Sequence, residues 1–211
     1  MNELKVNDIK SVVVIGAGLM GSQIAELMAR LGQYRVTLVD VKDEFVSKGL
    51  AGIDQRAEKF FVAKGKMTPE QKKELMARIS GTVEIAGAAA GADFIVEAAT
   101  ENISLKKDLF RKLDQSGPPH AILSSNTSYL SITEIASATS RQDRVVGMHF
   151  FNPVAMMKLV EVVKGAKTSE NTAEVTSSVV RILQKEPVVC RDSYGFLANR
   201  AYIALRLEAV Q

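Results

Sequence analysis

The 211-residue sequence predicts an α/β protein with a doubly wound, mostly parallel sheet, and three observations support this fold class. Short apolar runs alternate with amphipathic helical segments along the chain, which is typical of successive βα units. The first run, residues 12–15, is β-branched throughout and has no polar alternation, as expected of a strand that is covered on both faces. Polar residues follow several of the runs, where ligands bind in sheets of this kind.

The first strand is followed by a glycine turn with the sequence Gly16-Ala17-Gly18-Leu19-Met20-Gly21. The first glycine permits a tight turn, the second lets backbone approach a pyrophosphate, and the third lets the next helix pack close to the strand. That helix has apolar residues at helical spacing as far as Leu31, and its N-terminus suits an anion. The pattern predicts a Rossmann-type dinucleotide site.

An acidic residue follows the second apolar run. This run, Val36–Val39, ends at Asp40, nineteen residues after Gly21. A carboxylate there accepts hydrogen bonds from the adenosine ribose hydroxyls and repels a 2′-phosphate. We therefore predict NAD rather than NADP as the cofactor, and we favour this interpretation over a structural βαβ turn without a ligand.

The composition narrows the function classes. The net charge is +3 without a basic block, so nothing indicates nucleic acid as a partner. The single cysteine, Cys190, excludes an intrachain disulfide and is expected at a buried strand end. No apolar run approaches the roughly 18 residues of a membrane span, and the N-terminus lacks a signal-peptide core. We expect a cytoplasmic protein with no membrane partner and no metal site.

Two helices are expected between the second and third strands. The first lies within residues 45–64, and the second begins at Thr68, where Pro69 and Gln71 complete a capping box. A plain mononucleotide-binding unit needs only a short connection at this point. The extra segment is therefore predicted to be a helical hairpin insertion, either solvated or acting as an arm over a substrate.

The remaining elements are predicted in chain order. Strands are expected at 82–85, 94–97, 121–123, 145–148, 159–163 and 188–189. Helices are expected at 105–113, from a capping box of Ser131 and Glu134 to Ala138, at 170–184, and from about Asn199 onward. A surface turn at 118–120 leaves His120 solvated, whereas His149 follows the strand at 145–148 directly.

Several stretches are shared with a known family. They are the glycine turn, Ile95–Ala98 with Glu101-Asn102, Ser125–Ser128, His149–Pro153, Met157–Glu161 and Gly195–Arg200. The sequence His-Phe-Phe-Asn-Pro followed by Lys-Leu-Val-Glu is far more specific than the glycine turn. With these motifs the chain resembles the L-3-hydroxyacyl-CoA dehydrogenases, including 3-hydroxybutyryl-CoA dehydrogenases, over nearly its whole length.

This resemblance implies NAD-dependent oxidation of (S)-3-hydroxyacyl-CoA to 3-oxoacyl-CoA, and the reverse reaction. His149 is implied as the general base, with Glu161 as the carboxylate that fixes the imidazole tautomer and stabilises the imidazolium. Ser128 and Asn199 are implied to bind the substrate oxygens. Acyl-CoA is thus the expected partner.

The cofactor site implied by the resemblance consists of the glycine turn (Gly16, Ala17, Gly18, Leu19, Met20, Gly21), the ribose acid Asp40, and the nicotinamide-side contacts Glu101 and Lys106. One departure lies beside the substrate residues, because Tyr129 stands where the family often has a serine.

The C-terminal end predicts a second, incomplete domain. We expect a dinucleotide-binding domain at 1–191 and, at 192–211, the start of an all-α domain that serves substrate binding and dimerisation in the family. Its first apolar residues are Leu197, Ile203, Leu205, Leu207 and Val210. The resemblance implies that the chain stops before most of this domain, and that a longer chain forms a homodimer through the missing helices.

Two other functions stay open. A gulonate-type NAD dehydrogenase for sugar acids has the same fold and shares the His-Phe-Phe-Asn-Pro sequence. A non-catalytic NAD-binding protein is the second alternative, although it has no reason to keep all four residues implied for catalysis.

Overall fold

The computed structural model describes residues 4–209 and contains an eight-stranded sheet. The strands are β1 (Ser11–Ile15), β2 (Arg35–Val39), β3 (Ile79–Thr82), β4 (Phe94–Glu97), β5 (Ile122–Ser125), β6 (Val145–Phe150), β7 (Leu159–Lys164) and β8 (Glu186–Arg191). Their order in the sheet is β3-β2-β1-β4-β5-β6-β7-β8. Only β6 and β7 pair in antiparallel fashion among these strands. The predicted doubly wound, mostly parallel sheet is confirmed.

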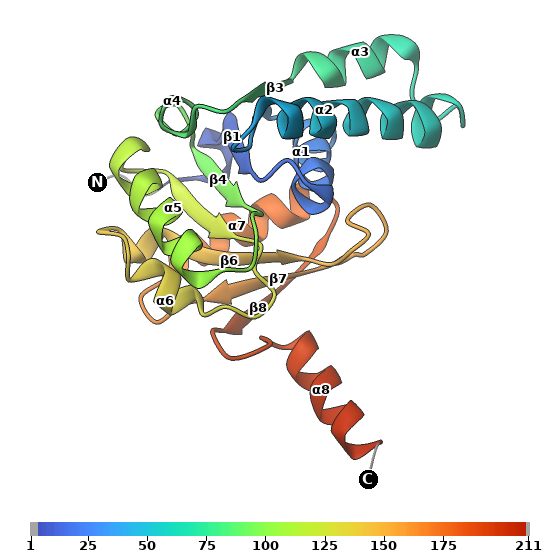
Figure 1. Cartoon of the computed structure of the whole chain (residues 1–211). Coiled ribbons are helices and arrows are strands. Elements are labelled where there is room, and N and C mark those ends of the chain that lie inside the picture. The colour runs from blue at the N-terminus through green and yellow to red at the C-terminus, as the bar shows by residue number, and fades with distance from the viewer. Residues whose placement is uncertain (1–3, 210–211) are drawn as a thin grey trace.

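Helices cover both faces of the sheet (Figure 1). They are α1 (Leu19–Arg30), α2 (Asp43–Ala57), α3 (Pro69–Ala77), α4 (Ile85–Ala89), α5 (Ile103–Ser116), α6 (Ile132–Ala136), α7 (Glu170–Ile182) and α8 (Ala198–Glu208), with short helical turns at Val6–Asp8, Glu58–Val62 and Gln142–Arg144. Strand β1 shows how the layers form. Val12 and Val14 belong to the core beneath α1 and α7, while Val13 and Ile15 belong to the core beneath α5 and α6. Each such buried side chain contributes about 1.5–3 kcal/mol, which explains the lack of polar alternation.

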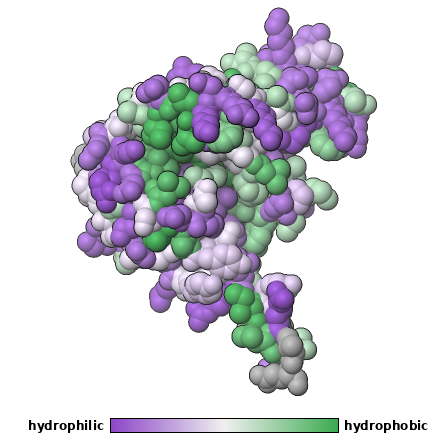
Figure 2. Space-filling view, in the orientation of Figure 1, coloured by the Kyte–Doolittle hydropathy of each residue, from purple (hydrophilic) through white to green (hydrophobic). Residues whose placement is uncertain are grey.

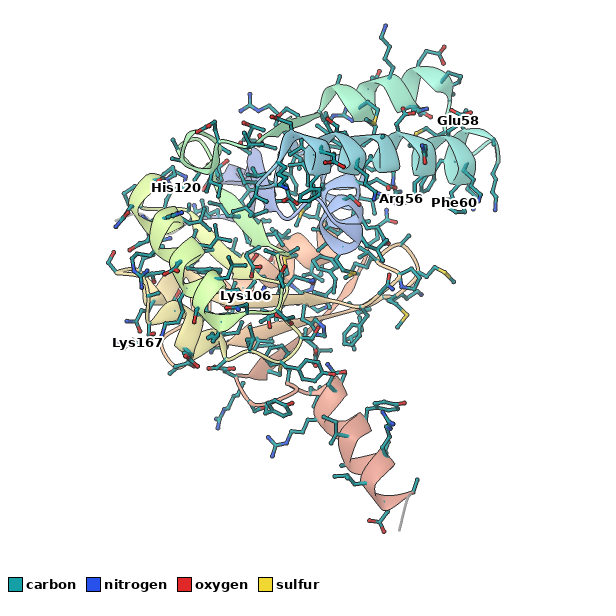
Figure 3. All side chains as sticks on the ribbon, viewed as in Figure 1. Arg56, Glu58, Phe60, Lys106, His120 and Lys167 are labelled. Atoms are coloured by element: carbon teal, nitrogen blue, oxygen red, sulfur yellow. The ribbon has the colours of Figure 1, made fainter. Side chains whose placement is uncertain are left out.

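The predicted helical insertion is present as α2 and α3, which we call the helical arm (Figure 1). Thr68 and Gln71 form both bonds of the capping box, so α3 begins where the sequence predicts. Lys72 of α3 pairs with Asp54 and Glu58 across the hairpin at 2.9 and 3.1 Å. Figure 3 shows Arg56, Glu58 and Phe60 along α2 and the turn that extends it.

The predicted strand at 82–85 is wrong. Strand β3 begins earlier, with Ile79 paired to Val36 of β2, and it ends at Thr82. The Thr82 hydroxyl accepts a hydrogen bond from the Glu84 N–H and turns the chain out of the sheet. The alanine-rich segment 85–89 then forms α4, as its helix propensity favours.

The other boundaries differ less. Ser131 caps α6 by accepting from the Glu134 N–H, but its own hydroxyl donates to Asp192, and α6 ends at Ala136. Strand β8 is longer than the predicted 188–189. None of the helices within residues 4–209 combines the length and apolar character that a membrane crossing requires.

Helix α8 projects away from the two helical layers (Figure 1). Its apolar surface is visible in Figure 2, and the exposed side chains on or beside it include Leu197, Tyr202, Ile203, Leu205 and Leu207. Val210, the last of the predicted apolar residues, lies outside the described part of the chain. The division between domains at residues 191 and 192 stays a prediction.

Candidate active site

The glycine turn joins β1 to α1, and its three glycines meet different surroundings. Gly16 has a φ of +101°, and a Cβ there would lie 2.6 Å from the Ala98 carbonyl oxygen. A Cβ on Gly21 would lie 1.7 Å from the Gly16 carbonyl oxygen, so these two positions hold helix against strand. A Cβ on Gly18 would meet no atom within 4 Å. Gly18 therefore faces open space, as the predicted pyrophosphate site requires.

The N-terminus of α1 adds hydrogen-bond donors to this space. Gly18 is the N-cap residue and has no side chain to occupy the first N–H groups of the helix. These groups lack intrahelical partners and carry partial positive charge. Both features fit an anion, so the residues present suit the dinucleotide that the glycine turn predicts.

Asp40 follows β2 and lies beside the glycine turn. Its Oδ2 accepts from the Ala17 N–H at 2.7 Å, and its Oδ1 accepts from the Val41 N–H at 2.7 Å. The carboxylate is half-buried, so it has surface left for a ligand. Asp40 thus shapes the turn, and its contact with a ribose stays a prediction.

His149 and Glu161 are direct neighbours across the antiparallel β6–β7 pair. The His149 Nδ1 lies 2.7 Å from the Glu161 Oε2, and both side chains are buried. The Glu161 Oε1 accepts from the N–H groups of Leu197 and Ala198 at 2.9 and 2.8 Å. The ring of Phe151 packs against the imidazole with centroids 4.6 Å apart. The pair is therefore rigidly placed.

The bonds around Glu161 determine which ring nitrogen of His149 donates a hydrogen bond. Burial raises the pKa of Glu161, but the hydrogen bonds from His149 and from two backbone N–H groups outweigh burial, so this pKa lies below the usual glutamate range. An ionised carboxylate can only accept, so Nδ1 is the ring nitrogen that donates to Glu161. No group within residues 4–209 is hydrogen-bonded to the His149 Nε2.

A cavity of about 310 Å³ opens beside His149. Its walls come from Met20 of the glycine turn and from Asn126, Ser128, Tyr129, His149, Phe150, Phe151, Asn152 and Asn199. Three residues predicted to bind or transform substrate therefore meet there. Asn199 also donates to the Ser128 carbonyl oxygen at 3.5 Å, a long bond that links α8 to the loop after β5.

A larger groove of about 650 Å³ lies near the ends of β7 and β8. Lys164, Cys190, Arg191 and Asp192 are among its lining residues, but none of the predicted site residues is. Burial first, then the charges of Glu161 and Asp192, raise the pKa of the Cys190 thiol to about 11, which fits a half-buried strand residue and not a nucleophile. The smaller cavity at His149 is the candidate active site.

Comparison with known proteins places the chain. A family model described as 3-hydroxyacyl-CoA dehydrogenase, NAD binding domain, matches residues 11–193. The chain belongs to the 3-hydroxyacyl-CoA dehydrogenase family. NAD is accordingly its cofactor, and the glycine turn lies within the matched domain.

Members of this family with similar sequences include mitochondrial hydroxyacyl-coenzyme A dehydrogenase of Rattus norvegicus, which is 42% identical over 207 residues, covering 96% of this chain and 66% of the relative. The probable 3-hydroxybutyryl-CoA dehydrogenase of Bacillus subtilis is 42% identical over 203 residues, covering 96% of this chain and 70% of the relative. The crystal structure of (S)-3-hydroxybutyryl-CoA dehydrogenase from Ralstonia eutropha superimposes with a TM-score of 0.90 at 39% identity, covering 95% of this chain and 70% of that one. The chain spans about two thirds of the length of the rat relative.

Glu101 and Lys106, the predicted nicotinamide-side residues, both form hydrogen bonds within the protein. The exposed Glu101 carboxylate accepts from the Ser128 N–H at 2.6 Å and from the Thr127 hydroxyl at 2.8 and 2.9 Å. Lys106, labelled in Figure 3, is only 1% exposed. Its Nζ lies 2.5 Å from Glu97 and 3.5 Å from Glu101. Lys106 thus connects the two glutamates from inside the protein, and direct contact with the cofactor stays a prediction for both residues.

Two residues of this family member carry bonds that the sequence did not predict. Glu97 is fully buried and accepts from the Ala99 N–H, the Lys106 ammonium and the Ser125 hydroxyl. Asn126 accepts from the Phe150 N–H at 2.8 Å and so ties the loop after β5 to β6. An acidic residue inside an apolar strand signals a buried partner, because an unpaired buried charge is costly. The bond of Asn126 has no comparable signal in the sequence.

Proposed function

We propose that the protein catalyses the NAD-dependent oxidation of (S)-3-hydroxyacyl-CoA to 3-oxoacyl-CoA, and the reverse reduction. The observation that carries this proposal is the His149–Glu161 pair, because its imidazole lines a cavity between the glycine turn and the loop after β5. The names of the relatives support the same substrate class.

His149 is the general base in this proposal. Its Nε2 takes the proton of the 3-hydroxyl while the C3–H bond breaks and the electron pair leaves C3 as hydride, so the substrate becomes a ketone. NAD, when bound, supplies the hydride acceptor. Glu161 stabilises the imidazolium through Nδ1, and general-base catalysis of this kind contributes about 10²–10⁴-fold.

Ser128 and Asn199 hold the substrate oxygens. Both side chains line the cavity beside His149, and fixing the 3-oxygen between them and Nε2 places C3 for transfer. Glu101 accepts from the Thr127 hydroxyl and the Ser128 N–H and so orders the loop after β5. Gly18 and the first turn of α1 hold the pyrophosphate, and Asp40 holds the adenosine ribose.

Assembly and location are part of the proposal. The exposed apolar side chains of α8 favour association, and we propose a homodimer of the protein in its full length. Sedimentation of the chain at several concentrations tests self-association. We propose a cytoplasmic location, which fractionation of the source cells tests.

The direct test is oxidation of NADH with acetoacetyl-CoA, followed by NADH absorbance, in the full-length protein and its His149→Gln variant, with the 211-residue chain measured beside them. We expect turnover that the variant abolishes. Free acetoacetate and a free sugar acid serve as matched substrates without CoA. Turnover restricted to the free acids would favour the sugar-acid dehydrogenase, and NADH binding without any turnover would favour a non-catalytic protein.

A further inference from the structure

The loop of residues 151–158 joins β6 to β7 and therefore lies between His149 and Glu161 in the chain. Phe151 and Asn152 of this loop wall the cavity. The loop has little regular structure of its own, apart from the turn in which the Met156 and Met157 N–H groups both donate to the Pro153 carbonyl oxygen. Its shape depends on bonds from other elements.

One of these bonds comes from the helix that begins at the glycine turn. Gln23 lies in the second turn of α1 and is 8% exposed. Its Oε1 accepts from the N–H of Val154, a residue that is 1% exposed and lies 131 positions away in the sequence. The bond satisfies a buried backbone donor that the loop cannot satisfy itself.

The other bonds come from Lys185, which precedes β8. Its Nζ donates to the carbonyl oxygens of Val154 and Met157 at 2.5 and 2.8 Å, and the side chain is 6% exposed. No carboxylate within residues 4–209 forms an ion pair with it. Burial, together with the charge of Arg30, lowers the pKa of Lys185. Burying an ammonium without a carboxylate partner is costly. The two hydrogen bonds to carbonyl oxygens offset part of this cost for Lys185.

We propose that Gln23 and Lys185 are positioning residues that clamp the 151–158 loop, Gln23 to α1 and Lys185 to the start of β8, and thereby fix the orientation of the His149 imidazole in the cavity. The clamp joins the helix of the glycine turn to the hairpin that carries His149 and Glu161. Only the catalytic meaning of this clamp rests on the proposed function. The geometric effect on His149 can be measured without turnover.

Nuclear magnetic resonance of the full 211-residue chain tests the clamp. The chain has two histidines, so the ring nitrogen signals of His149 and His120 are readily told apart. The variants are Gln23→Met and Lys185→Met, which keep side-chain length and remove the bonds. Gln55→Met and Lys112→Met, at exposed positions, are the matched controls.

We expect amide exchange at Val154 to rise roughly fivefold in Gln23→Met, because one hydrogen bond is lost. The ring signals of His149 should shift in both clamp variants, while those of His120 stay in place and both controls match the wild type. Unchanged His149 signals in folded Gln23→Met would overturn the proposal, and this variant decides alone if Lys185→Met does not fold. Turnover with acetoacetyl-CoA is measured in parallel. A full-length protein without turnover would count against the proposed function, whereas the ring signals of the 211-residue chain would still decide the clamp.

Discussion

Glu97 and Glu161 are both fully buried carboxylates in strands of the same sheet, yet their surroundings differ in kind. Glu97 is closed on all sides by a lysine ammonium, a serine hydroxyl and a backbone N–H. Glu161 is paired with an imidazole that lines a cavity. The Glu97–Lys106 pair, in which the carboxylate has only protein partners, stabilises the structure. The Glu161–His149 pair leaves one ring nitrogen without a hydrogen bond to the described residues, so this pair is suited to proton transfer.

Replacing the open partner should have the largest effect on catalysis. For His149→Gln we expect turnover of acetoacetyl-CoA to fall by about 10²–10⁴-fold, since the general base is lost, while NADH affinity changes less than about twofold. Steady-state kinetics and NADH titration measure both quantities. His120→Gln is the matched control, because His120 pairs with Asp93 far from the cavity. A large loss of NADH binding in His149→Gln would contradict the assigned role.

Replacing the closed partner should instead affect stability. Lys106→Met leaves Glu97 buried without its cation, so we expect the free energy of unfolding to fall by about 3–5 kcal/mol in urea denaturation. The exposed Lys112→Met is the control. The double variant Glu97→Leu with Lys106→Met should recover most of the loss, because no charge is then left buried. If Lys106→Met were as stable as the wild type, the Glu97–Lys106 pair would not be the structural counterpart of the Glu161–His149 pair.

A third carboxylate, Asp40, lies at the cofactor end and sharpens the comparison. For Asp40→Ala we expect NADH to bind roughly 10–100-fold more weakly and the preference for NADH over NADPH to shrink, because charged hydrogen bonds to the ribose and repulsion of a 2′-phosphate are both lost. Titration with the two cofactors measures this, with the exposed Asp43→Ala beside it. Unchanged selectivity would show that Asp40 only shapes the glycine turn through the Ala17 N–H.

Acid should weaken the open pair in a defined direction. The pKa of Glu161 is lowered in the folded chain, so Glu161 adds stability above the pKa of an unfolded glutamate, about 4.3, and this contribution is lost as the pH falls through the folded value. We expect the free energy of unfolding of Glu161→Gln to depend less on pH in this acid range than that of the wild type. Exposed Glu174→Gln should follow the wild-type curve. Parallel curves for all three proteins would refute the lowered pKa.

The smallest effect is expected at Cys190, near Glu161 but outside the cavity lining. With a thiol pKa of about 11, alkylation at pH 8 should be on the order of 100-fold slower than for free cysteine. Cys190→Ser should leave turnover unchanged. Fast alkylation of Cys190, or loss of turnover in Cys190→Ser, would show that Cys190 of β8 contributes to the active site.

The sequence predicted what depends on local pattern and not what depends on distant packing. The β-branched run and the glycine turn predict β1, α1 and the open position at Gly18, because each residue there has a local steric reason. Strand β3 escaped prediction, since Ile79 gains its strand conformation by pairing with Val36 and not from its own neighbours. The Gln23–Val154 bond joins residues 131 positions apart and leaves no periodic trace.

The site divides in the same way. The family motif predicts His149 and Glu161, and the β6–β7 register explains why residues twelve positions apart meet. Lys106 was predicted as a nicotinamide-side contact, and that contact stays a prediction. Its long side chain is buried and pairs with the buried Glu97. Only the three-dimensional structure reveals this buried ion pair.

The two backbone N–H groups of Leu197 and Ala198 that donate to Glu161 couple the start of α8 to this carboxylate. The eleven residues of α8 extend about 16 Å from this point of attachment. A tilt of the helix must stretch one of these bonds or drag the carboxylate along, and His149 with it. The outer end of α8 is thereby connected, through Glu161, to the imidazole that we propose as the general base.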